Sequence, residues 1–282
     1  MEATNTETFA RATAPEDDPK PMPPALLFFA HPDDETIALG GRLGRFGGAH
    51  LVHVTDGVPH NENLPKAHGL NSFAEYVNAR QVELRHVLEI AGVAGMSREC
   101  LGVPDQEASL QLTWLTRRLL LLLHIHHPDV IFTHPYEGGH PDHDACAFAA
   151  HHAVELKRFH REPAPLIVEA PFYHASHDGM ETGVFLPAGR ETPQLRYPLS
   201  PREQARKRAL LNAFATQHET LRCFPVDEER YRIAPAYEFR RPPHPGGVFY
   251  DHHRWGISSH AFCELAWEAG DALEEEMKAA CC

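Results

Sequence analysis

The hexapeptide AHPDDE at residues 30–35 brings one imidazole and three carboxylates together. It follows an apolar run, residues 25–29, which predicts a buried strand. Because Pro32 disfavours a helical conformation at His31, we expect the strand to end there and a helix to begin at the acidic residues. One aspartate would suffice to cap that helix, whereas imidazole and carboxylate together suit a divalent metal ion. The hexapeptide is therefore a candidate metal site.

A second stretch, GGHPDHD at residues 138–144, has the same context. It follows an apolar strand predicted at residues 129–133 and opens a helix predicted at residues 141–157. Open α/β sheets bind their ligands at the carboxyl ends of the strands. We therefore expect the two stretches to contribute to one site.

Together the two stretches offer a set of two histidines and one carboxylate, namely His31, Asp34 and His143. Such a set is common around catalytic zinc, which keeps an open position for water. Zinc lowers the pKa of that water towards about 7 and polarises a bound carbonyl group. The arrangement therefore favours hydrolysis.

Three neighbouring side chains would complete this chemistry. Asp33 is placed to take the proton of the water. His140 could polarise the developing oxyanion or protonate a leaving amine. Asp142 could hold the His140 ring in one orientation.

Some of these assignments have alternatives. His140 could be the third ligand in place of His143, since either could reach the metal. His134, which ends the strand at residues 129–133, is expected to be a core histidine. Glu35 is expected to be an acid of the first helical turn and not a ligand.

Strands and helices alternate along most of the chain. Strands are predicted at residues 25–30, 49–55, 99–103, 129–133 and 166–170, and helices at residues 36–46, 72–91, 109–125 and 141–157. This alternation predicts an α/β fold with a mainly parallel, doubly wound sheet. Residues 58–71 are predicted to form a long loop.

The alternation loosens after residue 171. Antiparallel edge strands are expected at residues 184–186 and 194–197, a helix with a capping box at residues 200–216, and a closing helix at residues 258–278. Residues 225–256 are rich in proline, arginine and aromatic side chains, and no element is predicted there. We expect this part to be a C-terminal extension of the α/β fold.

Composition excludes several classes of partner. The net charge of −13 over 282 residues argues against nucleic acid and anionic membranes. The apolar run at residues 119–123 is far shorter than the roughly 20 residues of a membrane span. Six cysteines without paired spacing predict reduced thiols in a cytoplasmic protein. Residues 1–24 are polar and acidic, which predicts a disordered tail before a domain at residues 25–282.

The two stretches resemble the signature of the PIG-L (LmbE-like) N-acetylglucosamine deacetylase family, and the resemblance covers roughly residues 25–220. It implies a zinc hydrolase with a Rossmann-like fold, with one zinc ion per chain. The metal ligands implied are His31, Asp34 and His143, with Asp33 as the general base and His140 as the electrophilic or acid group.

The resemblance also extends to residues that bind sugar in relatives. Arg80 and Asp105 match such positions, although Arg80 could equally pair with Glu83 on a helix surface. The usual family pattern does not define residues 225–282. Substrate choice is expected to depend on those residues and on residues 58–71.

The favoured function is therefore removal of an acetyl group from an N-acetylated amino sugar or its conjugate. An amidase that acts on another acylated amine is the first alternative. A metal-dependent phosphoesterase would often use two metal ions, and ligands for only one are evident. A non-catalytic sugar-binding or nucleotide-binding module would have no use for Asp33 beside the ligands. The sequence leaves the aglycone and a possible homo-oligomer open.

Overall fold

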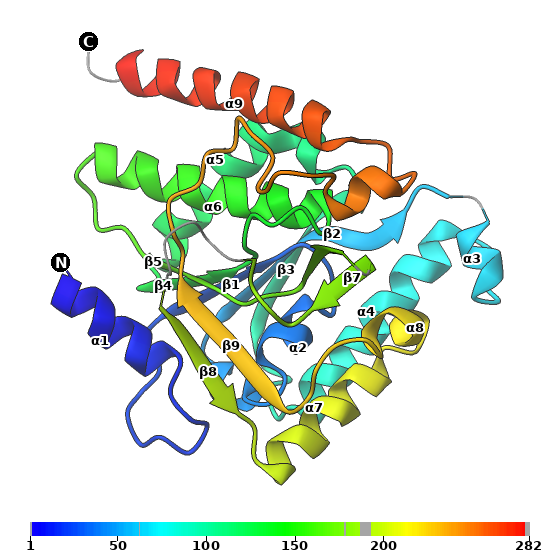
Figure 1. The fold of residues 1–282 in the computed structure, drawn as a ribbon. Helices are drawn as coiled ribbons and strands as arrows, with labels where there is room; N and C mark the ends of the chain where they lie inside the picture. Colours follow the sequence, from blue (N-terminus) through cyan, green and yellow to red (C-terminus); the bar gives the residue numbers. More distant parts are fainter. Residues whose placement is uncertain (1, 62, 178, 187–192, 280–282) are drawn as a thin grey trace.

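A central sheet of seven strands organises the protein, whose computed structural model describes residues 2–61, 63–177, 179–186 and 193–279. The strand order is β3-β2-β1-β4-β5-β9-β8 (Figure 1). The strands are β1 (Ala25–Phe29), β2 (His50–Pro59), β3 (Ser97–Asp105), β4 (Val130–Thr133), β5 (Leu166–Glu169), β8 (Gln194–Pro198) and β9 (Glu228–Ile233). Strands β1 to β5 pair in parallel, and β9 and β8 extend the sheet antiparallel. The predicted mainly parallel sheet is confirmed.

Helices cover both faces of this sheet (Figure 1). One face carries α2 (Asp34–Leu39), α4 (Phe73–Ile90) and α7 (Pro201–Ala213), and the other carries α5 (Leu112–His126) and α6 (Pro141–Phe159), with α9 (Ser259–Ala279) packed against both. Shorter helices are α1 (Glu2–Ala12), α3 (Leu64–Ala67), α8 (His218–Leu221) and the 3-10 helices η1 (Leu43–Phe46), η2 (Ala108–Gln111), η3 (Ala215–Gln217) and η4 (Phe249–His252). The fold is therefore doubly wound.

Strand β1 lies at the middle of the core. Leu27 and Phe29 pack into the apolar cluster on one face, and Leu26 and Phe28 into the cluster on the other. Successive side chains of a strand point to opposite faces. A strand buried on both faces needs a continuous apolar run, which explains why residues 25–29 carry no polar side chain.

Local capping signals fix where three long helices begin. Ser72 accepts a hydrogen bond from the main-chain N–H of Glu75 at the start of α4. Pro141 is the first residue of α6, and Ser200 and Glu203 form the capping box of α7. These starts agree with the prediction.

The helix predicted over residues 36–46 is interrupted, because α2 ends at Leu39 and η1 follows separately. A Cβ on Gly41 would lie only 2.6 Å from the Leu199 side chain. The main-chain N–H of Gly41 donates to the Glu229 carboxylate at 2.8 Å. Contacts with the C-terminal part of the chain therefore end α2 early.

The N-terminal residues differ from the predicted disordered tail, since residues 2–12 form α1. Thr13 and Ala14, which follow it, are buried. Their main-chain carbonyls accept hydrogen bonds from the guanidinium of Arg42. Main-chain groups make these contacts, so the low apolar content of residues 1–24 does not reveal them.

The middle of the C-terminal part also departs from expectation. Residues 184–186 do not form the predicted edge strand, whereas residues 194–197 do lie in the edge strand β8. A separate hairpin precedes them, made of β6 (Tyr173–Ser176) and β7 (Gly179–Thr182). Strand β9 and η4 lie within residues 225–256, where no element was predicted. The predicted loop at residues 58–71 contains the end of β2 and α3.

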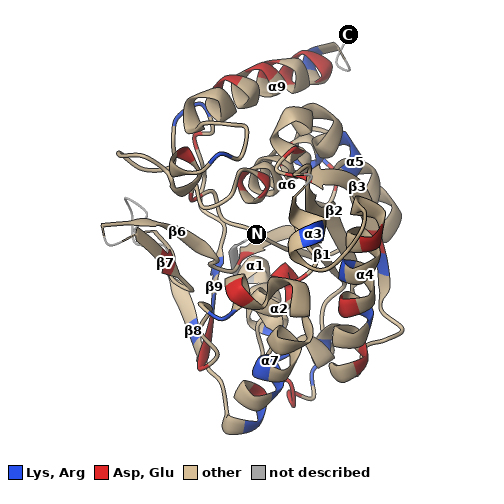
Figure 2. Ribbon diagram, turned by 90° about the vertical axis from the view of Figure 1, so that its right-hand side faces the viewer, with Lys and Arg blue, Asp and Glu red and all other residues tan. Residues whose placement is uncertain are grey.

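Among the described residues, no helix combines the length and apolar character needed to cross a membrane. Acidic residues are prominent along α9 (Figure 2).

Candidate metal centre

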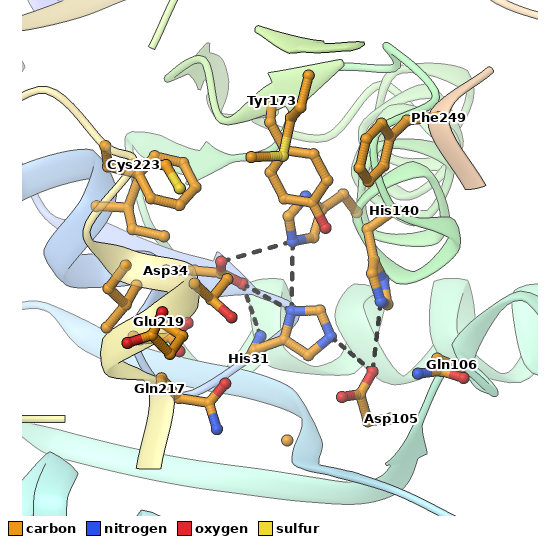
Figure 3. A pocket seen from close by; sticks show the side chains of 18 of the residues that line it. His31, Asp34, Asp105, Gln106, His140, Tyr173, Gln217, Glu219, Cys223 and Phe249 are labelled. Carbon is orange, nitrogen blue, oxygen red and sulfur yellow. Dashed lines mark hydrogen bonds and ion pairs between the residues drawn. The ribbon is translucent and has the colours of Figure 1, made fainter. Parts of the chain in front are cut away.

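The two sequence motifs meet at the carboxyl edge of the parallel sheet (Figure 3). His31 follows β1, and His143 lies in the first turn of α6, which follows β4. These two strands are neighbours in the sheet, so the residues that leave their carboxyl ends are brought together.

His31, Asp34 and His143 form a compact trio. His31 Nδ1 lies 3.4 Å from Asp34 Oδ2, His143 Nε2 lies 3.5 Å from Asp34 Oδ1, and the two ring nitrogens are 3.3 Å apart. Tetrahedral zinc ligands at about 2.0–2.1 Å from the ion lie roughly 3.3–3.4 Å from one another. The donor types suit a divalent metal ion, and Asp34 faces the two histidines through different oxygens of its carboxylate.

Surrounding groups hold the trio in place. Asp34 Oδ2 accepts a hydrogen bond from the main-chain N–H of His31 at 2.7 Å. The His134 ring stacks on the His143 ring, with centroids 3.9 Å apart. Burial lowers the pKa of His134 to about 3, and its Nε2 accepts the N–H of Ala30, so the ring is neutral. His134 is thus a fully buried histidine that packs against a trio residue.

Two carboxylates contact the other nitrogen of His31. Asp105 Oδ1 and Asp142 Oδ2 each lie 3.2 Å from His31 Nε2. Burial opposes protonation of this ring, but Asp105 first and Asp142 next raise the pKa of His31 well above its ordinary value. Carboxylates in this position orient a histidine ligand and make it more basic.

The predicted contact between Asp142 and His140 is present, and the Asp142 carboxylate makes a closer contact with His31. Asp142 Oδ2 lies 3.8 Å from His140 Nδ1, farther than its 3.2 Å from His31 Nε2. The main-chain N–H groups of Gln106 and Ala108 hold the Asp142 carboxylate, at 2.6 and 3.0 Å. Those donors direct the carboxylate towards His31.

His140 caps helix α6 and lies beside the trio. Its Nδ1 accepts the main-chain N–H of Asp142, and its Nε2 faces Asp105 Oδ1 at 3.5 Å. Ligand atoms of His31, His140 and His143 lie within 4.8 Å of one another. Because Nδ1 of His140 is occupied by a donor, this ring is less suited than His143 to bind the same ion. Burial lowers the pKa of His140 well below its ordinary value.

Asp33 stands next to the trio in a strained conformation. Its φ of 143° lies in a region that side chains other than glycine rarely adopt. Burial raises the pKa of Asp33 to about 7, and Arg80 opposes this rise by donating to Asp33 Oδ2 at 3.2 Å. Asp33 therefore offers a carboxyl group that changes protonation near neutral pH.

Arg80 is buried below the pocket, with 1% of its surface exposed. Its Nη2 donates to the Pro32 carbonyl at 2.7 Å, while Nε and Nη1 have no hydrogen-bond partner among the described residues. Glu83, the alternative partner, instead accepts hydrogen bonds from Thr216. Arg80 thus lies among the pocket residues and not on a helix surface.

Glu35 is held apart from the trio. Its carboxylate accepts the main-chain N–H of Asp33 and lies 3.0 Å from His53 Nε2. Glu35 is fully buried in the first turn of α2. These contacts agree with a structural acid of the helix.

A pocket of about 470 Å³ opens above the trio. Its outer lining comes from three segments that the sequence motifs do not cover: the β6–β7 hairpin, residues 217–224 and residues 249–255. Tyr173, Phe249 and Trp255 are prominent in this lining, and sequence reasoning assigned them no role. For Phe249 and Trp255, the sequence feature that could have indicated such a role is the aromatic content of residues 225–256.

Comparisons with known proteins agree with this site. Residues 26–154 match the family model PIG-L: GlcNAc-PI de-N-acetylase. A probable N-acetyl-alpha-D-glucosaminyl L-malate deacetylase 2 from Bacillus cereus is 29% identical over 147 residues, which are 50% of this chain and 64% of that protein. The match thus spans less than two thirds of that relative.

Solved structures show a similar fold. The N,N′-diacetylchitobiose deacetylase from Pyrococcus horikoshii has a TM-score of 0.53 and 20% identity, over 83% of this chain and 92% of that chain. The zinc-inhibited form of teicoplanin deacetylase has a TM-score of 0.53 and 13% identity, over 76% of this chain and 99% of that chain. The family match includes both motifs, so over residues 26–154 the chain is similar to the PIG-L family.

Proposed function

We propose that the protein is a metal-dependent N-deacetylase that hydrolyses the acetamide of an amino sugar or its conjugate. The observation that carries this proposal is the trio of His31, Asp34 and His143, whose donor types suit a divalent metal ion. The deacetylase names of the relatives support the same reaction class.

The metal proposed is a single zinc ion held by the trio. Two imidazoles and one carboxylate leave a fourth position open, which is typical of catalytic zinc. A bound divalent ion would supply a more acidic water and a more polarised amide carbonyl. One solved relative is described as a zinc-inhibited form, so other divalent ions belong in the test.

The chain's own groups would then handle the protons. Asp33, whose pKa is raised to about 7 by burial, would accept the proton of the attacking water. His140 is neutral because burial lowers its pKa, and its Nε2–H would donate a hydrogen bond to the developing oxyanion. The proton on Asp33 is then available to the leaving amine.

Sugar binding is assigned to Arg80 and Asp105. Nε and Nη1 of Arg80, which have no hydrogen-bond partner among the described residues, would donate to sugar hydroxyls, since leaving them buried without partners is costly. Asp105 borders the pocket beside His31 and His140, where its carboxylate could accept from a hydroxyl.

The test is a screen for acetate release. The protein is freed of metal, reloaded with Zn²⁺, Co²⁺, Mn²⁺ or Mg²⁺, and given N-acetylated amino sugars, their conjugates, other N-acylated amines and phosphate esters. We expect acetate from the amino-sugar substrates only after metal is restored. Phosphate release without acetate release would contradict the proposal, as would equal acetate release by a His143→Ala variant.

A further inference from the structure

Three aromatic rings of the C-terminal segment form a continuous row that begins at His140. The Trp255 ring lies 4.7 Å from the His140 ring, the His253 ring stacks on Trp255 at 4.6 Å, and the Phe249 ring lies 4.3 Å from His253. All three side chains line the pocket, and Figure 3 shows Phe249 beside His140. We call Phe249, His253 and Trp255 the aromatic wall.

The aromatic wall is fixed to the loop that carries His140. The main-chain N–H of Phe249 donates to the Gly138 carbonyl at 2.8 Å. Gly138 has a φ of +69°, and a Cβ there would lie 2.5 Å from Val248. Asp144 binds both sides of this junction, because Oδ1 accepts the N–H of Gly138 and Oδ2 accepts the hydroxyl of Tyr250. The wall is therefore built into the site.

An apolar surface continues from the wall around the pocket. The Tyr173 ring, from β6, lies 5.4 Å from the Phe249 ring, and Met180 of β7 also lines the pocket. Leu221 and Phe224 also line the pocket, together with the polar Glu219, Thr220 and Arg222 of the same segment. The pocket volume of about 470 Å³ is in the range of about 300–1,000 Å³ that encloses a drug-sized ligand.

The size of an acetyl group decides what can occupy this surface. If the reaction is the deacetylation proposed above, the acyl side of the substrate is a single methyl group beyond the carbonyl. Only the amine side is large enough to reach a row of three rings. Flat apolar groups pack best against aromatic faces. The few polar groups of such a pocket then fix the orientation of the ligand.

We propose that the aromatic wall selects substrates whose amino sugar carries an apolar, aromatic aglycone. This inference rests on the proposed function, and it names the class of conjugate that the site takes. The aglycone lies along Trp255 and His253, while the acetamide lies at the metal trio.

The first experiment compares two substrates by acetate release with the metal-loaded enzyme: the methyl glycoside and the phenyl glycoside of N-acetylglucosamine. We expect the wild type to prefer the phenyl glycoside by roughly threefold to tenfold in kcat/KM, mainly through KM, as one aromatic contact provides. Trp255→Ala should bring this ratio close to one, and Trp255→Phe should restore most of it. Trp267→Ala is the matched control, because Trp267 is 54% exposed on α9.

A second experiment reads binding without turnover. The chain has three tryptophans, so Trp114→Phe with Trp267→Phe leaves Trp255 as the only one. Asp33→Asn is added to this background to slow hydrolysis. The metal-loaded protein is then titrated with each glycoside. We expect the phenyl glycoside, and not the methyl glycoside, to change the Trp255 fluorescence.

The outcomes separate the two proposals. A fluorescence response to the phenyl glycoside without acetate release from any substrate would overturn the proposed function and support the wall. Acetate release with an unchanged phenyl-to-methyl ratio in Trp255→Ala, and no fluorescence response, would overturn the wall alone. A wild-type preference for N-hexanoyl over N-acetyl sugar that is lost in Trp255→Ala would place the acyl chain on the wall and also overturn this inference.

Discussion

Two buried groups of charged residues lie at opposite ends of helix α2, and their charge balance differs. Beyond the C-terminal end, the single carboxylate of Glu229 accepts from Arg42 Nε at 3.2 Å and from Lys207 Nζ at 3.3 Å. At the N-terminal end, the guanidinium of Arg80 donates to one carboxylate, that of Asp33, at 3.2 Å. The carboxylates of Asp34, Asp105 and Asp142 lie close by, and each faces the His31 ring.

The difference indicates which of the two groups balances its charge without a bound ligand. A buried carboxylate is tolerated when cations and hydrogen bonds surround it, as they surround Glu229. The group at the N-terminal end sets four carboxyl groups against one guanidinium and the His31 ring, and a divalent cation would add positive charge there. We call Arg42, Lys207 and Glu229 the structural cluster. The candidate metal centre differs from it by having several carboxylates beside imidazole rings, whereas both groups are buried.

The largest effect is expected from removing a proposed ligand. His143→Ala should lose both bound metal and acetate release, because two remaining ligands hold zinc far more weakly than three. Elemental analysis and the acetate assay measure the two losses. A His143→Ala protein with a full complement of metal would assign the ligand elsewhere, with His140 the first alternative.

A smaller loss is expected when the proposed base is removed. Asp33→Asn should keep the metal and lower kcat by about 10²–10⁴-fold, the usual contribution of general-base catalysis. Burial raises the pKa of Asp33 to about 7, Arg80 opposes this rise, and a bound cation would lower the pKa further. The base acts only when deprotonated, so the wild-type rate should fall on the acidic side, at a pH below the pKa of about 7 because the bound cation lowers that pKa.

The pH–rate profile of Asp33→Asn is the matching control. Its acidic limb should be missing, while metal content stays that of the wild type. An Asp33→Asn protein that lacks metal, or that is fully active with metal bound, would show that the base is misassigned.

A third, smaller effect is expected from Asp142, which contacts His31 and not the trio as a whole. Asp142→Asn should weaken metal binding by about 10–100-fold, as for other carboxylates that orient a histidine ligand. Competition with a chelator measures the affinity. Asp271→Asn, on the exposed face of α9, is the control and should bind metal as the wild type does. Equal metal affinity of the two variants would mean that Asp142 acts only as an acidic residue in the first turn of α6.

The structural cluster should respond in the opposite way. Glu229→Gln should reduce the free energy of unfolding by about 3–5 kcal/mol, because it leaves Arg42 and Lys207 buried without their carboxylate. Metal content and the rate of the folded enzyme should not change. Denaturant unfolding measures the change in the free energy of unfolding. A Glu229→Gln protein that loses metal but keeps its stability would contradict the assignment of separate roles to the two groups.

The same variant has a defined pH signature. Burial raises the pKa of Glu229, but Lys207 and then Arg42 outweigh burial and bring it below its ordinary value. This group therefore stabilises the fold above its ordinary pKa, near 4.5, and the contribution is lost as the pH falls below that value. The free energy of unfolding of Glu229→Gln should fall less than that of the wild type on acidification.

Sequence reasoning was effective where local signals and strand order coincide. The apolar run at residues 25–29 and its polar end predict a buried strand and a site at the same edge, and the structure brings His31, Asp34 and His143 within 3.5 Å of one another. Their roles as ligands stay predictions. The closer contact of Asp142 with His31 was not predicted, because it depends on main-chain donors of the β3–η2 turn.

The C-terminal half could not be predicted in the same way. Strand β9 pairs with β5, some sixty residues earlier in the chain, and with β8. Such antiparallel pairings depend on contacts that no local pattern reveals. The position of Trp255 beside His140 depends in turn on the anchoring of η4 to Gly138.

The way the N-terminal segment is held has a consequence for its mutational tolerance. Arg42 and Arg45 donate to main-chain carbonyls of this segment, among them those of Thr13, Ala14 and Asp18. Every residue type presents the same carbonyl, so substitutions at the exposed positions of this segment, and not at the buried Ala12, Thr13 and Ala14, should be accepted widely in a deep mutational scan. Insertions and deletions shift the carbonyls away from the guanidinium groups, so they should be depleted.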